Sequence, residues 1–244
     1  MSGVYIVRRG SFMPPVPEFS YTGEHVRAQG PDGSVYIAFL SSGTLRFARP
    51  PVKKADLFLV SAGGNGKSGH FDSGSSIDYG GAGGDGGRIK TFEGKVFMDG
   101  MDYPIVIGQC GPLLNSTGGD TEAFEESSRD GESIPGGGCR QRGADGVFAF
   151  GDSEAGPWPG RRFGASGGGS GSYSHQTFTG QPGGFGGVWG AGRGGAGLPT
   201  GGVDGGTDAL PNSGSGGGAG GVGDAGGWKY GKGGSGILIM RFRR

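Results

Sequence analysis

Short runs of glycine recur along most of the chain, and they limit what it can fold into. They include residues 80–87, 183–187 and 214–223, and glycine accounts for 64 of the 244 residues. Glycine costs about 1 kcal/mol relative to alanine inside a helix. No ten-residue stretch free of Gly and Pro carries a helical apolar pattern. The sequence therefore predicts essentially no α-helix, which argues against nucleotide-binding folds built of alternating strands and helices.

Composition separates order from disorder in this chain. Glycine and the 14 prolines together form about 32% of the residues, above the ~25–30% at which an aperiodic chain is suspected of disorder. However, aromatic residues make up 10% of the sequence, whereas disordered segments are usually poor in them. Collagen is excluded because an unbroken Gly-X-Y period is missing. We therefore expect an ordered chain in which glycine forms the matrix.

The charge and cysteine content exclude several classes of protein. Lys and Arg total 22, as do Asp and Glu, so no basic field favours nucleic acid or an anionic membrane. No apolar run approaches the ~20 residues that span a bilayer, and the first residues lack a signal-peptide pattern. We expect cytoplasmic synthesis and no membrane insertion. Cys110 and Cys139 form no disulfide scaffold; free thiols are expected, although a bridge between them stays open.

Apolar stretches typical of β-strands flank the glycine-rich region. Residues 34–40, 44–48 and 56–61 precede it, and residues 236–242 follow it. Because the last strand is expected to pair with the early ones, residues 20–244 are predicted to form one structural domain. The expected parts are an N-terminal attachment segment with a stiff Pro-rich stretch (1–19), a strand framework with the first glycine runs (20–110), a glycine-rich region with loops (111–235) and a closing strand (236–244).

The glycine runs suit the polyproline II conformation, which has three residues per turn and about 3.1 Å of rise per residue. A GGX repeat in that conformation has two bare faces, so neighbouring backbones can approach and pair their N–H and C=O groups. The alternative is that the runs are flexible linkers. The predicted fold class is mainly β and irregular: a short β-strand framework that clamps a bundle of packed polyglycine II helices.

Two matches to catalytic motifs lack their structural context. Residues 61–68 (SAGGNGKS) nearly fit a phosphate-binding P-loop, but no helical pattern follows them to aim amides at a phosphate. Residues 164–168 (GASGG) match the G-x-S-x-G nucleophile elbow, but they have no helix after them, and only His175 follows as a histidine. Such matches are expected by chance in a chain rich in Gly and Ser. We therefore expect no enzymatic activity.

Metal and cofactor sites are also not indicated. His25, His70 and His175 are scattered, and no His/Cys spacing is typical of zinc. The acidic cluster lacks calcium-loop spacing and is expected to be a solvated loop; it comprises Asp120, Glu122, Glu125, Glu126, Asp130 and Glu132. We expect no cofactor and no bound metal.

Aromatic and polar side chains concentrate in the loops between the glycine runs. Since a lattice of glycine supplies no side chains, any specificity must come from these loops, and adaptable loops on a rigid core are a common arrangement for recognition. The alternative is that the aromatic residues form small cores that plug the ends of the lattice. The candidate receptor-binding residues are His70, Phe71, Tyr79, Tyr173, His175, Phe178, Trp189, Trp228 and Tyr230.

Four segments resemble glycine-rich domains of phage and prophage tail proteins. Residues 35–47 and 56–64 resemble the family's opening pattern of strand, S-G-T, strand and D-V-F-L-V-G-G-G-G. Residues 103–109 resemble its Y-x-I-x-I-G element, and residues 233–241 resemble its closing G-G-S-G-I-V-I-I-R. Ser61 and Ala62 depart from the pattern, where the family has glycine. A more distant similarity is to the tip adhesins of T-even-like phage long tail fibres, which use a polyglycine II sandwich.

This resemblance implies a virion protein made in the host cytoplasm. It would be a tail-fibre or tail-tip adhesin whose loops bind a bacterial surface receptor, either protein or glycan. Its N-terminal segment would attach to a tail-fibre or tail protein, and no nucleic acid would be bound. Two alternatives stay open: a structural tail component without receptor binding, and an ice-binding protein, since some of those are also polyglycine II bundles.

Overall fold

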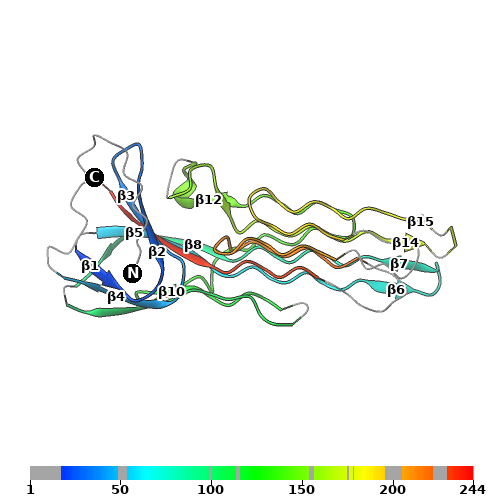
Figure 1. Ribbon diagram of the computed structural model, residues 1–244, viewed down its shortest axis with the longest axis horizontal. Coiled ribbons are helices and arrows are strands. Elements are labelled where there is room, and N and C mark those ends of the chain that lie inside the picture. The colour runs from blue at the N-terminus through cyan, green and yellow to red at the C-terminus, as the bar shows by residue number, and fades with distance from the viewer. Residues whose placement is uncertain are drawn as a thin grey trace.

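The protein is elongated, with β-sheets at one end, a bundle of glycine-rich segments in the middle and a small sheet at the other end (Figure 1). We call the two ends the base and the tip. The computed structural model describes residues 18–48, 54–98, 100–113, 116–153, 157–174, 176–177, 179–195, 205–221 and 230–243.

Two antiparallel sheets of five strands form the base. The first has the order β2 (His25–Gln29), β3 (Val35–Phe39), β16 (Ile237–Phe242), β5 (Lys54–Val60) and β8 (Ile89–Val96). The second has the order β1 (Phe19–Tyr21), β4 (Gly43–Phe47), β9 (Asp102–Val106), β10 (Glu122–Ala123) and β11 (Glu126–Ser127). The last strand, β16, lies between β3 and β5, so the C-terminal segment closes the sheet that the early strands begin.

Both faces of the first sheet are covered, which explains the continuous apolar runs in its strands. Leu238 and Met240 of β16 point into the core between the two sheets, whereas Ile237 and Ile239 point into a second cluster on the opposite face. That second cluster includes Phe163 of the short β-pair β12 (Val147–Phe148) and β13 (Arg162–Phe163). Alternate side chains of one strand therefore stabilise two separate cores.

A buried charge cluster links β5 to the C-terminal strand. The Asp56 carboxylate is nearly inaccessible, and its Oδ2 accepts hydrogen bonds from the Nε atoms of Arg241 (2.9 Å) and Arg243 (2.6 Å). The Gly94 N–H donates to its Oδ1 at 3.0 Å. The guanidinium group of Arg241 also lies 4.2 Å from the ring centroid of Phe150. The charge is thus compensated by several donors, as a buried carboxylate requires.

Backbone hydrogen bonds in the bundle repeat every three residues. In the segment 164–171, the N–H groups of residues 166 and 169 donate to the segment 141–146, and those of residues 167 and 170 donate to the segment 80–88. Those of residues 168 and 171 donate to the segment 190–195. A period of three is the repeat of the polyproline II helix, which has no internal hydrogen bonds and must find partners in its neighbours.

The packing of these segments is that of a hexagonal lattice. The segments 164–171 and 213–221 lie at its centre, and each exchanges backbone hydrogen bonds with six others. The neighbours of 213–221 are the segments 61–67, 80–88, 164–171, 190–195, 205–210 and 230–236. Within the described residues these runs are a bonded lattice and not flexible linkers.

Glycine is required where two segments touch. A Cβ added to Gly83 would stand closer than 3.0 Å to the carbonyl of Gly167, and one added to Gly217 would meet the carbonyl of Gly231 in the same way. The small side chains of Ser166, Ser170 and Ser213 are accommodated fully buried. A larger side chain, that of Asn65, is also buried: its amide nitrogen donates to the Gly111 and Leu113 carbonyls, and its amide oxygen accepts the Gly233 N–H.

The predicted fold class is confirmed: the structure is mainly β and irregular. The described residues contain no α-helix, only the short 3₁₀ turn η1 (Ala149–Gly151). Nor do they include a helix of the length and apolarity that crossing a membrane would take.

Candidate functional site

A four-stranded antiparallel sheet forms the tip. Its order is β15 (Thr179–Gly180), β14 (Tyr173–Ser174), β7 (Ile77–Tyr79) and β6 (His70–Asp72). Each strand continues a glycine segment of the bundle, so two hairpins about 100 residues apart in sequence meet at the end of the lattice (Figure 1). The lattice positions these loops because it holds the segments that lead into them.

The tip sheet brings together four of the predicted receptor-binding residues. His70 pairs with Tyr79 across the first hairpin, Phe71 lies next to His70 on β6, and Tyr173 pairs with Asp78 between the hairpins. The Tyr79 side chain is 36% exposed, whereas Tyr173 is 1% exposed. Tyr173 therefore serves as a small core that holds the two hairpins together, the alternative role considered for the loop aromatic residues. Tyr79 lies at the surface.

Two other predicted residues lie elsewhere. Trp189 is in the turn that joins two segments at the base side of the bundle: the Val188 N–H donates to the Asp145 carboxylate, and the Leu210 N–H donates to the Gly190 carbonyl. Trp189 has a left-handed φ of 66° and is 52% exposed.

Tyr230 lies at the side of the bundle, where its hydroxyl donates to the Pro112 carbonyl at 3.2 Å. His175, Phe178 and Trp228 lie outside the described residues, as do residues 1–17 of the predicted attachment segment.

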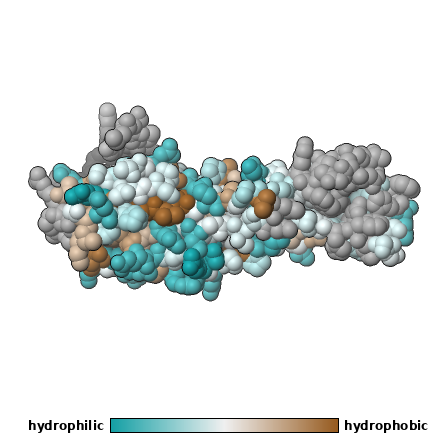
Figure 2. Space-filling model, turned by 90° about the horizontal axis from the view of Figure 1, so that it is seen from below, coloured by the Kyte–Doolittle hydropathy of each residue, from teal (hydrophilic) through white to brown (hydrophobic). Residues whose placement is uncertain are grey.

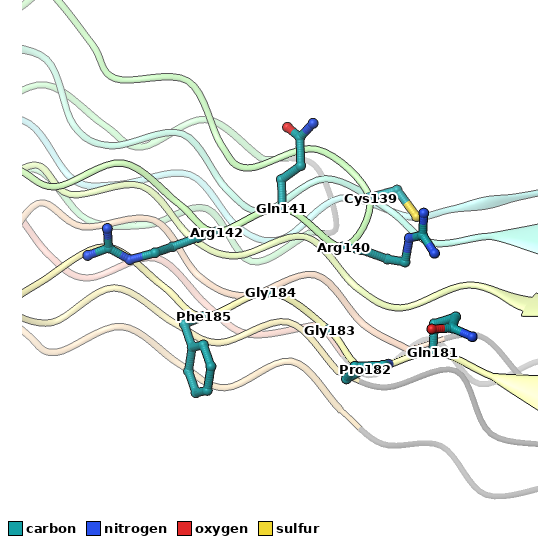
Figure 3. Close-up of a pocket in the computed structure, with 9 residues that line it drawn as sticks. All are labelled: Cys139, Arg140, Gln141, Arg142, Gln181, Pro182, Gly183, Gly184 and Phe185. Atoms are coloured by element: carbon teal, nitrogen blue, oxygen red, sulfur yellow. The ribbon is translucent and has the colours of Figure 1, made fainter.

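A groove runs along the flank of the bundle directly behind the tip sheet. It is lined by residues 139–142 and 181–185, and its volume is about 580 Å³. We call it the arginine groove. Figure 3 shows its two walls, with Arg140, Gln181 and Pro182 toward the tip strands and Arg142 and Phe185 toward the base. Gly183 and Gly184 leave part of its surface as bare backbone.

The groove is positively charged. Arg140 has a left-handed φ of 61°, its backbone N–H donates to the Ser170 carbonyl, and its exposed guanidinium group has no ion pair within the described residues. Arg142 pairs with Asp145 at 2.6 Å. Phe185 is 65% exposed, and the guanidinium carbon of Arg193 lies 5.1 Å from its ring centroid.

Sequence reasoning missed the arginines of this groove. The string C-R-Q-R at residues 139–142 was the available signal, because two cations there interrupt a run of glycine.

The motif matches are part of the lattice. In the P-loop-like stretch, the N–H groups of Gly63, Gly64 and Gly66 donate to neighbouring segments, and Lys67 pairs with Asp85 at 3.0 Å. These amides are therefore not aimed at an open site. In the G-x-S-x-G match, Ser166 is fully buried, and its hydroxyl accepts the Ala144 N–H.

Metal-ligating and thiol groups are dispersed in the described part of the chain. No cluster of three or more His, Cys, Asp or Glu side chains that could hold a metal ion occurs there. Cys110 and Cys139 are both free thiols, which answers the question that the sequence left open.

Comparison with known proteins assigns the family. A family model described as a glycine-rich domain matches residues 40–243, which is most of the chain, and the protein therefore belongs to this glycine-rich domain family. No curated protein shows a significant match.

Proposed function

We propose that this protein is an adhesin of a phage tail fibre or tail tip, which binds a bacterial surface receptor through the side chains at its tip. The observation that carries this proposal is the separation of its two ends. Strand β1, which follows the predicted attachment segment, lies in the base, whereas the tip sheet lies at the far end of the bundle (Figure 1). One end is thus available to the virion and the other to the cell.

The base has an apolar surface that supports attachment to a tail protein. A groove of about 710 Å³ crosses β9 and the β10–β11 hairpin, and the base end carries hydrophobic surface in Figure 2. Exposed apolar patches of this kind mark interaction sites. The exposed apolar side chains in this base groove are Val96, Met98, Met101 and Val106.

The lattice suits a scaffold for recognition. Its stability comes from backbone pairing, which does not depend on the loops that join its segments. The loops at the tip can therefore change in sequence without loss of the fold, as a protein that follows a changing receptor requires. The proposed mechanism is binding and not catalysis.

Exchange of the tip hairpins tests this proposal. Residues 65–79 and 172–182 are replaced by those of a relative, and adsorption of the phage to a panel of hosts is measured. The expected result is a changed host range. The control is Trp189→Ser, which alters an exposed aromatic residue at the opposite end of the bundle. Unchanged adsorption after the exchange would refute the role of the tip.

Deletion of the gene separates the adhesin from a structural tail component. An adhesin is dispensable for assembly, so particles of normal appearance that fail to adsorb are expected. Particles without tails would favour the structural alternative.

A further inference from the structure

We propose that the arginine groove binds an anionic sugar chain of the bacterial surface, one that carries carboxylate or phosphate groups. This inference rests on the proposed function, which it makes more specific by naming the chemical class of a receptor. The groove adjoins the tip sheet, since Gln181 directly follows β15 and its N–H donates to the Ser172 carbonyl at 2.9 Å. A chain bound at the tip can therefore continue along it.

Charge is the first argument. The residues that line the groove include two arginines and, within the described part of the chain, no acidic residue. Asp145 offsets the charge of Arg142, so the positive charge of the groove comes from Arg140, in a protein whose formal net charge is zero. Guanidinium groups bind carboxylate and phosphate through paired hydrogen bonds, and Arg140 has no anion to satisfy it among the described residues.

The direction of the two cations is the second argument. In Figure 3 the guanidinium groups of Arg140 and Arg142 point toward opposite ends of the groove. Two cations that point apart suit a polymer with a negative charge on successive units better than a single small anion. Asp145 holds Arg142 on the base side through their ion pair.

The remaining surface of the groove suits sugar rings. Phe185 presents an exposed ring, flat and apolar, on which the C–H face of a sugar can lie. Gln181 carries an amide group that makes no hydrogen bond within the described residues, and it can donate to and accept from sugar hydroxyls. The glycines admit a ring close to the backbone. A few polar groups around an apolar surface in a concave site of several hundred Å³ is the usual form of a ligand site.

Direct binding tests the proposal. Purified full-length protein is titrated at low salt with oligogalacturonate, a sugar chain that carries carboxylates, and with a phosphomannan, a sugar chain that carries phosphates. Neutral dextran and single-stranded DNA are measured beside them. We expect binding to at least one of the two anionic polymers and none to dextran. The polymer that binds more tightly shows whether the groove prefers carboxylate or phosphate. Affinity falls as salt is added, because the charges are exposed.

Substitutions locate the site. Loss of a hydrogen bond to a charged group costs about 1.5–3 kcal/mol, so each of Arg140→Ala and Arg142→Ala is expected to weaken binding about tenfold or more. The matched control for the double variant Arg140→Ala/Arg142→Ala is Arg46→Ala/Arg129→Ala, which removes the same charge from the base and is expected to bind as the wild type does. Phe185→Ser is expected to weaken binding to the sugar polymers and to leave any binding of DNA unchanged.

Several results would overturn this inference. The first is that neither anionic polymer binds. The second is that the control and the Arg140/Arg142 variants bind with equal affinity, and the third is that DNA binds more tightly than the sugar polymers. The proposed function is judged separately by adsorption to cells. If Arg140→Ala/Arg142→Ala adsorbs as the wild type does while the tip exchange abolishes adsorption, the groove is refuted and the adhesin stands.

Discussion

Two adjacent glycines of one segment provide a sharp test of the lattice. A Cβ added to Gly63 would stand closer than 3.0 Å to three backbone atoms, namely the O and C atoms of Ser215 and the N atom of Gly216. For Gly64 the nearest atom to an added Cβ is the Ser116 carbonyl oxygen at 3.3 Å. Both glycines donate a backbone hydrogen bond of 2.9 Å, to Gly234 and Asp85 respectively. The two positions differ mainly in the space for one methyl group.

The expected cost of Gly63→Ala is large because the obstacle is backbone. The segment 213–221 would have to move by about 1 Å, yet it is hydrogen-bonded to six neighbours. Overpacking of this kind costs about 1–3 kcal/mol, and each backbone hydrogen bond that is distorted costs about 1 kcal/mol more. Alanine restricts the unfolded chain and returns about 0.4–1 kcal/mol. We expect Gly63→Ala to lower the free energy of unfolding by about 2–3 kcal/mol.

Gly64→Ala should change the free energy of unfolding by no more than about 0.5 kcal/mol, because the neighbouring carbonyl needs to move only a few tenths of an ångström. Urea titrations followed by tryptophan fluorescence measure both variants, and the slopes of the two transitions must agree for the comparison to hold. Equal unfolding midpoints for the two variants would refute the close packing of these segments, and with it the lattice.

Three further predictions concern Asp56 and Ser215, and urea unfolding measures each of them. Asp56→Ala leaves Arg241 and Arg243 without their carboxylate and should lower the free energy of unfolding by about 3 kcal/mol. The control is Arg46→Ala, which removes an exposed ion pair and is expected to cost less than about 1 kcal/mol. A loss below about 0.5 kcal/mol for Asp56→Ala would contradict this prediction. Burial opposes ionisation of the Asp56 carboxyl, but the hydrogen bonds from Gly94, Arg243 and Arg241 outweigh it and hold the pKa below its usual value. The difference in free energy of unfolding between wild type and Asp56→Ala should therefore be full above about pH 4 and shrink as the pH falls below it. A difference that does not depend on pH would contradict the ion pairs. The Ser215 hydroxyl is buried without a hydrogen-bond partner among the described residues, so Ser215→Ala should be neutral or stabilise by up to about 1 kcal/mol, and a clear loss of stability would reveal a partner.

The fold was largely predictable because its signals are local. The continuous apolar run in residues 236–242 predicts a strand, and the structure shows why the run is continuous: Ile237 and Leu238 face different cores. The glycine runs predict polyglycine II because bare faces leave few other ways to pair the backbone. The resemblance to tail-protein glycine-rich domains correctly indicated the glycine-rich family.

The candidate site was less predictable, for a physical reason. Neighbouring segments of the lattice pair through backbone N–H and C=O groups, which are the same in nearly every residue. The sequence therefore does not indicate which segments lie side by side. The arginine groove exists only because residues 139–142 lie beside residues 181–185. In the same way, nothing in the sequence around Trp189 says whether its turn lies at the tip or at the base side of the bundle.

Binding of the purified protein to intact bacteria tests the central claim most directly. Labelled wild-type protein and the variant with exchanged residues 65–79 and 172–182 are incubated with candidate host strains, and the cell-bound fraction is measured over a range of protein concentrations. The account predicts saturable binding of the wild type to at least one strain, loss of that binding in the exchanged variant, and the same unfolding midpoint for both proteins. The account would be contradicted if the exchanged variant binds as the wild type does, or if the wild type binds to none of the strains.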